Sequence, residues 1–125
     1  MELQFRRFEF EAVVSLALAM IHADGDVDFK ETMVLQMQLD RFGIGVDQYQ
    51  SLVVAAKNMD KLRALSIITN LGYTEKKYIT ALLGVLMAAD GKIDDSEMKM
   101  WTFTSLVCDL PQMSIDEAFE IIKEV

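Results

Sequence analysis

The chain has 125 residues, 52% of them hydrophobic and 26% charged, a composition typical of one globular domain with a substantial core and not of a disordered chain. Its 12 basic and 20 acidic residues leave a net charge of −8, which argues against nucleic acid or an anionic membrane surface as a partner and favours a cation or a basic protein surface. One proline and six glycines suit long helices better than a turn-rich β fold.

Apolar residues recur at helical spacing along almost the whole chain, and no stretch shows convincing strand alternation. We therefore expect an all-α fold, a single compact domain over residues 1–125. The predicted helices lie, in chain order, at residues 4–23, 29–42, 48–57, 61–71, 75–89, 95–109 and 115–124. The second half of the first helix and most of the fifth are apolar all round, so these two should run through the centre. Small residues such as Ala17 and Gly84 would let them approach closely.

Helix starts are predicted from capping residues. Ser114 with Glu117 forms a full S-x-x-E capping box for the last helix. Asp47, Asp60 and Thr74 are the predicted N-caps of the third, fourth and fifth helices.

A nine-residue pattern, A-D-G-x-(V/I)-D-x-x-E, occurs twice in the chain. It starts at Ala23 and again at Ala89, an offset of 66 (89 − 23). Each copy follows a long apolar helix, and its Gly suits the left-handed backbone that ends a helix. We expect two pseudo-symmetric half-repeats, about residues 4–57 and 75–125, joined by a connector helix at about 61–71.

The second Asp and the Glu of each copy predict the start of the next helix. Asp28 and Asp94 are good N-caps, and Glu31 and Glu97 follow at the third helical position, as in a capping box. Capping alone can therefore account for these four residues.

The first Asp of each copy is harder to explain. Asp24 and Asp90 lie at helix C-termini, where a negative charge is disfavoured by roughly 0.3–1 kcal/mol. They either accept bonds from backbone N–H groups of the turn or serve as ligands for a cation or a basic partner group. Oxygen-only clusters suit calcium, magnesium or manganese. The D-x-D-x-D run at 24–28 does not continue as an EF-hand loop, because Phe29 stands where that loop needs Gly.

Little in the sequence points to catalysis. His22 is the only histidine and Cys108 the only cysteine, and we expect them to cap a helix end and to fill a core position. There is no glycine-rich phosphate loop, and one His with one Cys makes a zinc site very unfavourable. We therefore expect no enzyme.

The chain shows no sign of export or membrane insertion. Its longest apolar stretches, residues 12–21 and 79–89, are well short of the roughly 20 residues of a membrane span. The N-terminus lacks the basic-then-apolar order of a signal peptide, and the lone cysteine gives no evidence of an oxidising compartment. We expect a cytoplasmic location.

Nine methionines are many for this length. Met33 with Met37, and Met98 with Trp101, lie at helical spacing. They predict either adaptable core filling or a methionine-rich peptide groove.

The doubled motif after buried apolar helices resembles the tellurite-resistance TerB-like family, which includes the N-terminal region of a membrane-anchored J-domain co-chaperone. The resemblance covers roughly residues 12–110, and its specific part is 19–35 and 85–101. It implies an all-helical fold of two pseudo-symmetric halves and a stress-associated adaptor without established enzymatic activity. It also implies metal binding by the acidic turns, at Asp24, Asp28, Glu31, Asp90, Asp94 and Glu97.

Two functional hypotheses follow. The first is a non-enzymatic TerB-like module that binds a divalent cation or a protein partner through its acidic turns. The alternative is a structural or adaptor domain whose acidic turns only cap helices, with a protein partner bound at an exposed Met/aromatic surface.

Overall fold

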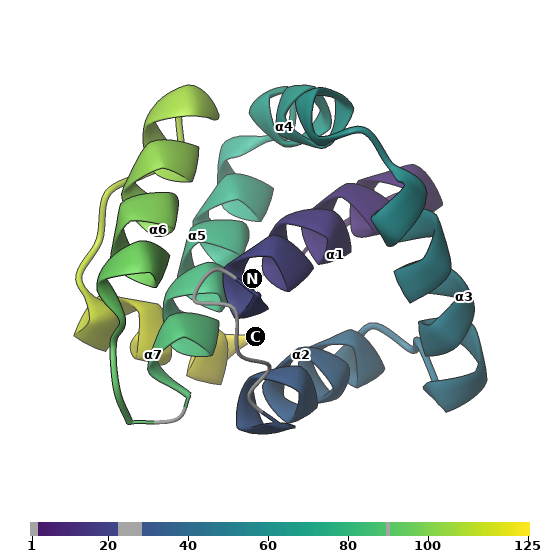
Figure 1. Cartoon of the computed structure of the whole chain (residues 1–125), viewed down its shortest axis with the longest axis horizontal. Coiled ribbons are helices and arrows are strands. Elements are labelled where there is room, and N and C mark those ends of the chain that lie inside the picture. Colours follow the sequence, from purple (N-terminus) through teal and green to yellow (C-terminus); the bar gives the residue numbers. More distant parts are fainter. Residues whose placement is uncertain (1–2, 23–28, 90) are drawn as a thin grey trace.

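The computed structural model describes residues 3–22, 29–89 and 91–125 of the chain. Most of these residues are helical, as the periodicity of the sequence predicts. Seven α-helices and no strand lie within these ranges (Figure 1). The helices are α1 Arg7–Ile21, α2 Phe29–Arg41, α3 Val46–Asn58, α4 Lys61–Thr69, α5 Tyr73–Ala88, α6 Asp95–Val107 and α7 Ile115–Glu124. The all-α prediction is confirmed, and the largest error in a helix start is at α1, which was predicted from residue 4.

The two most apolar helices, α1 and α5, form the centre of the fold, as predicted. They pack against each other, and α1 also contacts α2, α3, α4 and α6, while α5 contacts α2, α6 and α7. Both are buried over most of their length; the large side chains with almost no exposed surface include Met20, Ile21, Tyr78, Leu82, Leu83, Leu86 and Met87. No helix of the described ranges is long and apolar enough to cross a membrane.

The two halves follow the same plan. The starts of α5 and α1 differ by 66 positions (73 − 7), as do those of α6 and α2 (95 − 29), while those of α7 and α3 differ by 69 (115 − 46). Helix contacts also occur in equivalent pairs: α1 packs on α3 as α5 packs on α7, and α1 touches α6 as α5 touches α2. The extra three positions lie between α6 and α7.

The C-terminal ends of α2 and α6 have the same backbone geometry. Gly43 has a φ of 81°, and the next residue, Ile44, donates its N–H to Leu39 O at 3.1 Å. Asp109, 66 positions later, has a φ of 54°, and Leu110 donates to Ser105 O at 2.9 Å. Both ends are therefore Schellman-type caps.

The predicted N-caps are partly right. Ser114 Oγ accepts from Glu117 N at 3.1 Å while Glu117 Oε1 accepts from Ser114 N at 3.2 Å, so the capping box of α7 is confirmed. Asp60 holds the N-cap position of α4, although its side chain makes no capping bond.

The predicted caps of α3 and α5 are wrong. Gly45 and Gly72 occupy these N-cap positions, so both helices start two residues before the predicted position. Asp47 and Thr74 fall instead inside the first turn, where a carboxylate such as that of Asp47 still interacts favourably with the helix dipole.

The prediction that Gly84 lets α1 and α5 approach closely is wrong. A Cβ at this position would lie 3.0 Å from Trp101 Cζ2 of α6 and 3.2 Å from Ala118 Cβ of α7. The Trp101 ring is held against α5 by its indole N–H, which donates to Thr80 O at 3.1 Å. Gly84 is thus the point where α6 and α7 approach α5.

Buried polar side chains join the helices. Tyr78 Oη of α5 donates to Gln38 Oε1 of α2 at 3.0 Å, beside a cluster of the rings of Phe5, Phe10 and Phe42. Lys61 Nζ, at the start of α4, donates to both the carbonyl and the hydroxyl of the buried Ser15, at 3.2 and 3.1 Å.

Candidate functional site

Three of the six predicted metal ligands fall in the described part of the chain. Glu31 lies in the first turn of α2, and Asp94 and Glu97 lie at the start of α6. Asp24, Asp28 and Asp90 lie outside the described residues, so their predicted roles stay predictions.

Asp94 is the N-cap of α6, as predicted. Its Oδ1 accepts a hydrogen bond from Ser96 N at 2.7 Å. The preceding glycine, Gly91, has a φ of 81°, so it adopts the left-handed backbone expected where α5 ends. The second acidic turn therefore ends one helix and starts the next.

Glu31 and Glu97 are buried, although a capping role does not require burial. Each is the third residue of its helix, and each is only 2% exposed. Glu117 holds the same helical position in α7 and makes a complete capping box while exposed to solvent. Burying a carboxylate costs free energy unless other groups compensate for its lost hydration. The same feature recurs at two equivalent positions, so it belongs to the motif.

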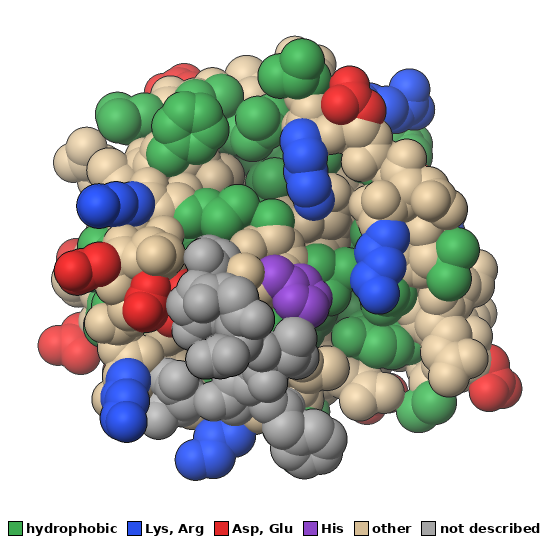
Figure 2. All heavy atoms as spheres, viewed as in Figure 1, with side chains coloured by type: hydrophobic (Ala, Val, Ile, Leu, Met, Phe, Trp, Pro, Cys, Tyr) green, Lys and Arg blue, Asp and Glu red, His purple; other side chains and the backbone are tan. Residues whose placement is uncertain are grey.

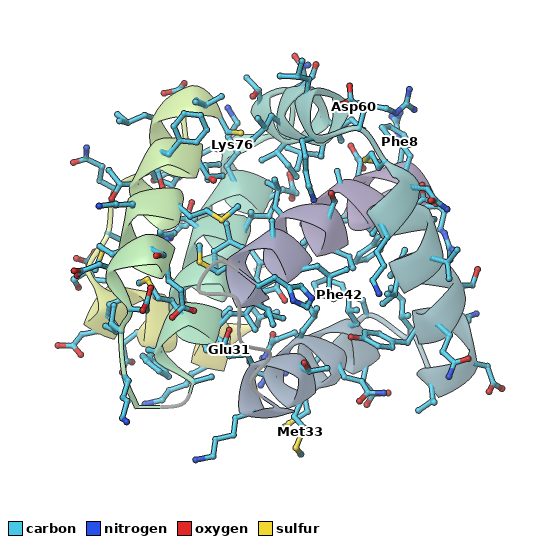
Figure 3. The ribbon with its side chains drawn as sticks, in the orientation of Figure 1. Phe8, Glu31, Met33, Phe42, Asp60 and Lys76 are labelled. Carbon is cyan, nitrogen blue, oxygen red and sulfur yellow. The ribbon has the colours of Figure 1, made fainter. Side chains whose placement is uncertain are left out.

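The side chains of α2 show how the sequence produces this burial. Figure 3 places Glu31 on the inner side of the N-terminal end of α2 and Met33 on its outer side. Leu35 and Gln38, four and seven residues after Glu31, are buried on the same inner face. In α6 the residues at the same spacing from Glu97, Trp101 and Thr104, are buried likewise. The i, i+4, i+7 register with buried positions was the available signal for Glu31 and Glu97.

The described residues alone do not assemble a metal centre. No group of three or more His, Cys, Asp or Glu side chains among them is arranged to hold a metal ion. The carboxylates that are described, on Glu31, Asp94 and Glu97, are hard oxygen donors of the kind that calcium, magnesium and manganese take. They fit such an ion chemically, and the remaining ligands of each predicted set belong to Asp24, Asp28 and Asp90.

His22 and Cys108 take the structural positions expected of them. His22 is the C-cap of α1, and Cys108 is a fully buried C-cap of α6 whose Sγ lies 3.5 Å from Leu65 O. Burial raises the pKa of the Cys108 thiol, against the smaller opposing effects of Thr69 and Lys76. An activated cysteine nucleophile needs the opposite shift.

The methionines divide between core and surface. Met20 and Met87 are buried in the core, and Met59, Met100 and Met113 pack against it. Met33, Met37 and Met98 are exposed. Core filling is therefore confirmed for five of the methionines, and the predicted pair Met33 and Met37 is a surface feature of α2.

A crystal structure of a protein of unknown function from Porphyromonas gingivalis is similar to this chain. The two are 35% identical in sequence with a TM-score of 0.88, and the match covers 99% of this chain and 100% of that one. No protein-family model matches the chain, and no curated protein matches it. The whole helical arrangement is therefore shared with the Porphyromonas protein.

Proposed function

We propose that this chain, which belongs to the same family as the Porphyromonas gingivalis protein of unknown function, is a non-enzymatic TerB-like, stress-associated domain that binds a divalent cation at its two acidic turns. The ligands are Asp24, Asp28 and Glu31 in the first turn and Asp90, Asp94 and Glu97 in the second. The lone cysteine supports a cytoplasmic location.

The observation that carries this proposal is the equivalent burial of Glu31 and Glu97. Glu117 completes its capping box while exposed to solvent, so capping alone does not require a buried glutamate. A divalent cation compensates for the desolvation of a carboxylate and requires oxygen ligands. It also gives a role to Asp24 and Asp90, which the sequence predicts at helix C-termini, where a negative charge is unfavourable.

The two turns carry the same net charge but distribute it differently. Each nine-residue copy of the motif holds four acidic residues and one basic residue, a net charge of −3. The first carries Asp26 where the second carries Lys92, and the second carries Asp95 where the first carries Phe29. Each predicted ligand set holds three carboxylates, so we expect the two sites to bind the same ion with similar affinity.

The alternative, a structural or adaptor domain, is supported by Asp94. Its bond to Ser96 N is a complete capping interaction that needs no cation. In this alternative the buried glutamates are held by backbone N–H groups of the turns, and added cations bind nowhere.

Calorimetric titration of the full chain with calcium, magnesium and manganese tests the proposal. We expect two sites of similar affinity for at least one of these ions. The double variant Asp24→Asn/Asp90→Asn should lose both sites. Asp47→Asn/Asp116→Asn is the matched control, because it removes the same charge from the first turns of α3 and α7. Binding no tighter than millimolar, or equal binding by the first double variant, would refute the metal site.

A further inference from the structure

A groove of about 480 Å³ runs along the second half of α6 and the loop that follows it. The walls of this α6 groove are about half apolar and half polar, with an exposed carboxylate at the edge. Its apolar residues and its acid are Trp101, Leu106, Asp109, Leu110, Pro111 and Met113, and the other wall residues are threonine, serine and glutamine. Its volume lies in the range of sites that hold one or a few ligand side chains.

The first half of the protein holds a smaller groove in the equivalent place. It measures about 210 Å³, and its walls include Asp40 and Ile44. Leu106 and Leu110 of the α6 groove lie 66 positions after these two residues (106 − 40 and 110 − 44). The larger volume accompanies the loop between α6 and α7, which is three residues longer than its counterpart between α2 and α3.

The first half also shows which residues the fold accepts beside such a groove. Asp40 and Arg41 end α2 with exposed charged side chains. At the same positions α6 carries Leu106 and Val107, which are 71% and 45% exposed. Phe103, one turn earlier, is exposed as well, and apolar side chains gather over this end of α6 (Figure 2). A clustered apolar surface that the fold does not require marks an interaction site.

Asp109 departs from the first half in the same region. Gly43, its counterpart, adopts the left-handed backbone freely, whereas Asp109 adopts it against the steric preference of an L residue. An acidic side chain is thus held at the edge of the groove although glycine suits that backbone better.

We propose that the α6 groove binds a short segment of a partner protein in which a bulky apolar side chain adjoins a Lys or Arg. The apolar side chain packs between Leu106 and Met113, and the basic side chain faces Asp109. Apolar burial provides the affinity, and the charge pair provides selectivity and a faster encounter. The net charge of −8 favours a basic segment and opposes pairing with a second copy of the chain. The groove is separate from the acidic turns and does not depend on cation binding.

Selection of random peptides displayed on phage, with the folded full chain as bait, tests the proposal. We expect enriched peptides to share a bulky apolar residue next to Lys or Arg. In fluorescence titrations with synthetic copies of them, Leu106→Asp/Val107→Arg should weaken binding by roughly tenfold or more. This variant installs the residues of the first half, so it should fold normally. Leu62→Asp is the matched control, because it removes an exposed leucine from α4 and should leave the affinity unchanged.

Asp109→Asn isolates the charge. It should weaken binding by a few-fold and reduce the dependence of affinity on salt. The proposal is overturned if no peptide is enriched, or if the enriched peptides bind Leu106→Asp/Val107→Arg as tightly as wild type. Self-association of the wild-type chain that this double variant abolishes would assign the groove to a second copy and overturn the peptide proposal as well.

Discussion

Asp109 and Gly43 hold equivalent positions at the ends of α6 and α2, and both have a left-handed backbone, with φ of 54° and 81°. Left-handed backbone is unfavourable for residues with a Cβ, less so for Asp than for most. We therefore expect Asp109→Gly to raise the free energy of unfolding by about 0.5–1 kcal/mol. Gly43→Ala should lower it by about 1 kcal/mol through backbone strain, since nothing lies within 4 Å of the added Cβ. Urea denaturation measures both, and a loss of stability in Asp109→Gly would show that the carboxylate stabilises the fold.

Gly84 should resist substitution although it lies in the interior of a helix. Alanine favours the helix by about 1 kcal/mol, but its Cβ would press on the Trp101 ring and on Ala118. Because the Trp101 indole is fixed by its bond to Thr80 O, overpacking should outweigh that gain. We expect Gly84→Ala to destabilise the protein by about 1 kcal/mol in thermal or urea unfolding, and less in a Trp101→Leu background. Equal effects in both backgrounds would mean that the ring is not the obstacle.

Stability should fall at alkaline pH. Burial raises the pKa of Tyr78 well above its ordinary value of 10.0, against a smaller opposing effect of Arg41, and burial also raises the pKa of Cys108 above 9.0. Above these ordinary values the unfolded chain loses protons that the folded chain keeps, so the free energy of unfolding decreases as pH rises. The stabilisation is complete below about pH 9 and declines above it.

Tyr78→Phe separates the contribution of Tyr78 from that of the other groups with raised pKa values, Cys108 and Tyr49. It removes the bond to Gln38, so the variant should be less stable at neutral pH, yet its stability should fall less steeply above about pH 10. Tyr73→Phe, at an exposed position on the same helix, is the control. Urea midpoints measured across this pH range decide the matter, and parallel declines for wild type and Tyr78→Phe would contradict the assignment.

The cap of α6 should respond to cations, whereas the cap of α7 should not. Asp94→Ala and Ser114→Ala each remove a side chain that accepts a backbone N–H, so each should cost about 0.5–2 kcal/mol in the presence of a chelator. With excess manganese the cost of Asp94→Ala should increase, because the variant also loses a ligand. Equal costs for Asp94→Ala with chelator and with manganese would leave capping as its whole role.

Residues close together in the sequence were enough to predict most of this fold, whereas features that depend on contacts between helices were missed. The helices and the caps at Asp94 and Ser114 depend on residues close in sequence, so they could be predicted. The N-caps Gly45 and Gly72 were missed because Asp47 ranks above glycine as a capping residue and Thr74 ranks level with it.

The contacts of Gly84 and the α6 groove depend on how helices meet, which one chain segment does not reveal. The burial of Glu31 and Glu97 could have been predicted, because each lies four and seven residues before positions on the buried face of its helix. The acidic residues of the candidate site could be chosen from the sequence. That Glu97 is buried while Glu117 is exposed was seen only in the packed structure.

The central claim is that each acidic turn binds a divalent cation, and anomalous scattering from a crystal grown with manganese tests it most directly. We expect one peak beside the carboxylate of Glu31 and a second beside that of Glu97, with Asp24 and Asp90 in contact with the respective ions. A map without a peak at either turn, in which backbone N–H groups alone surround these carboxylates, would contradict the claim.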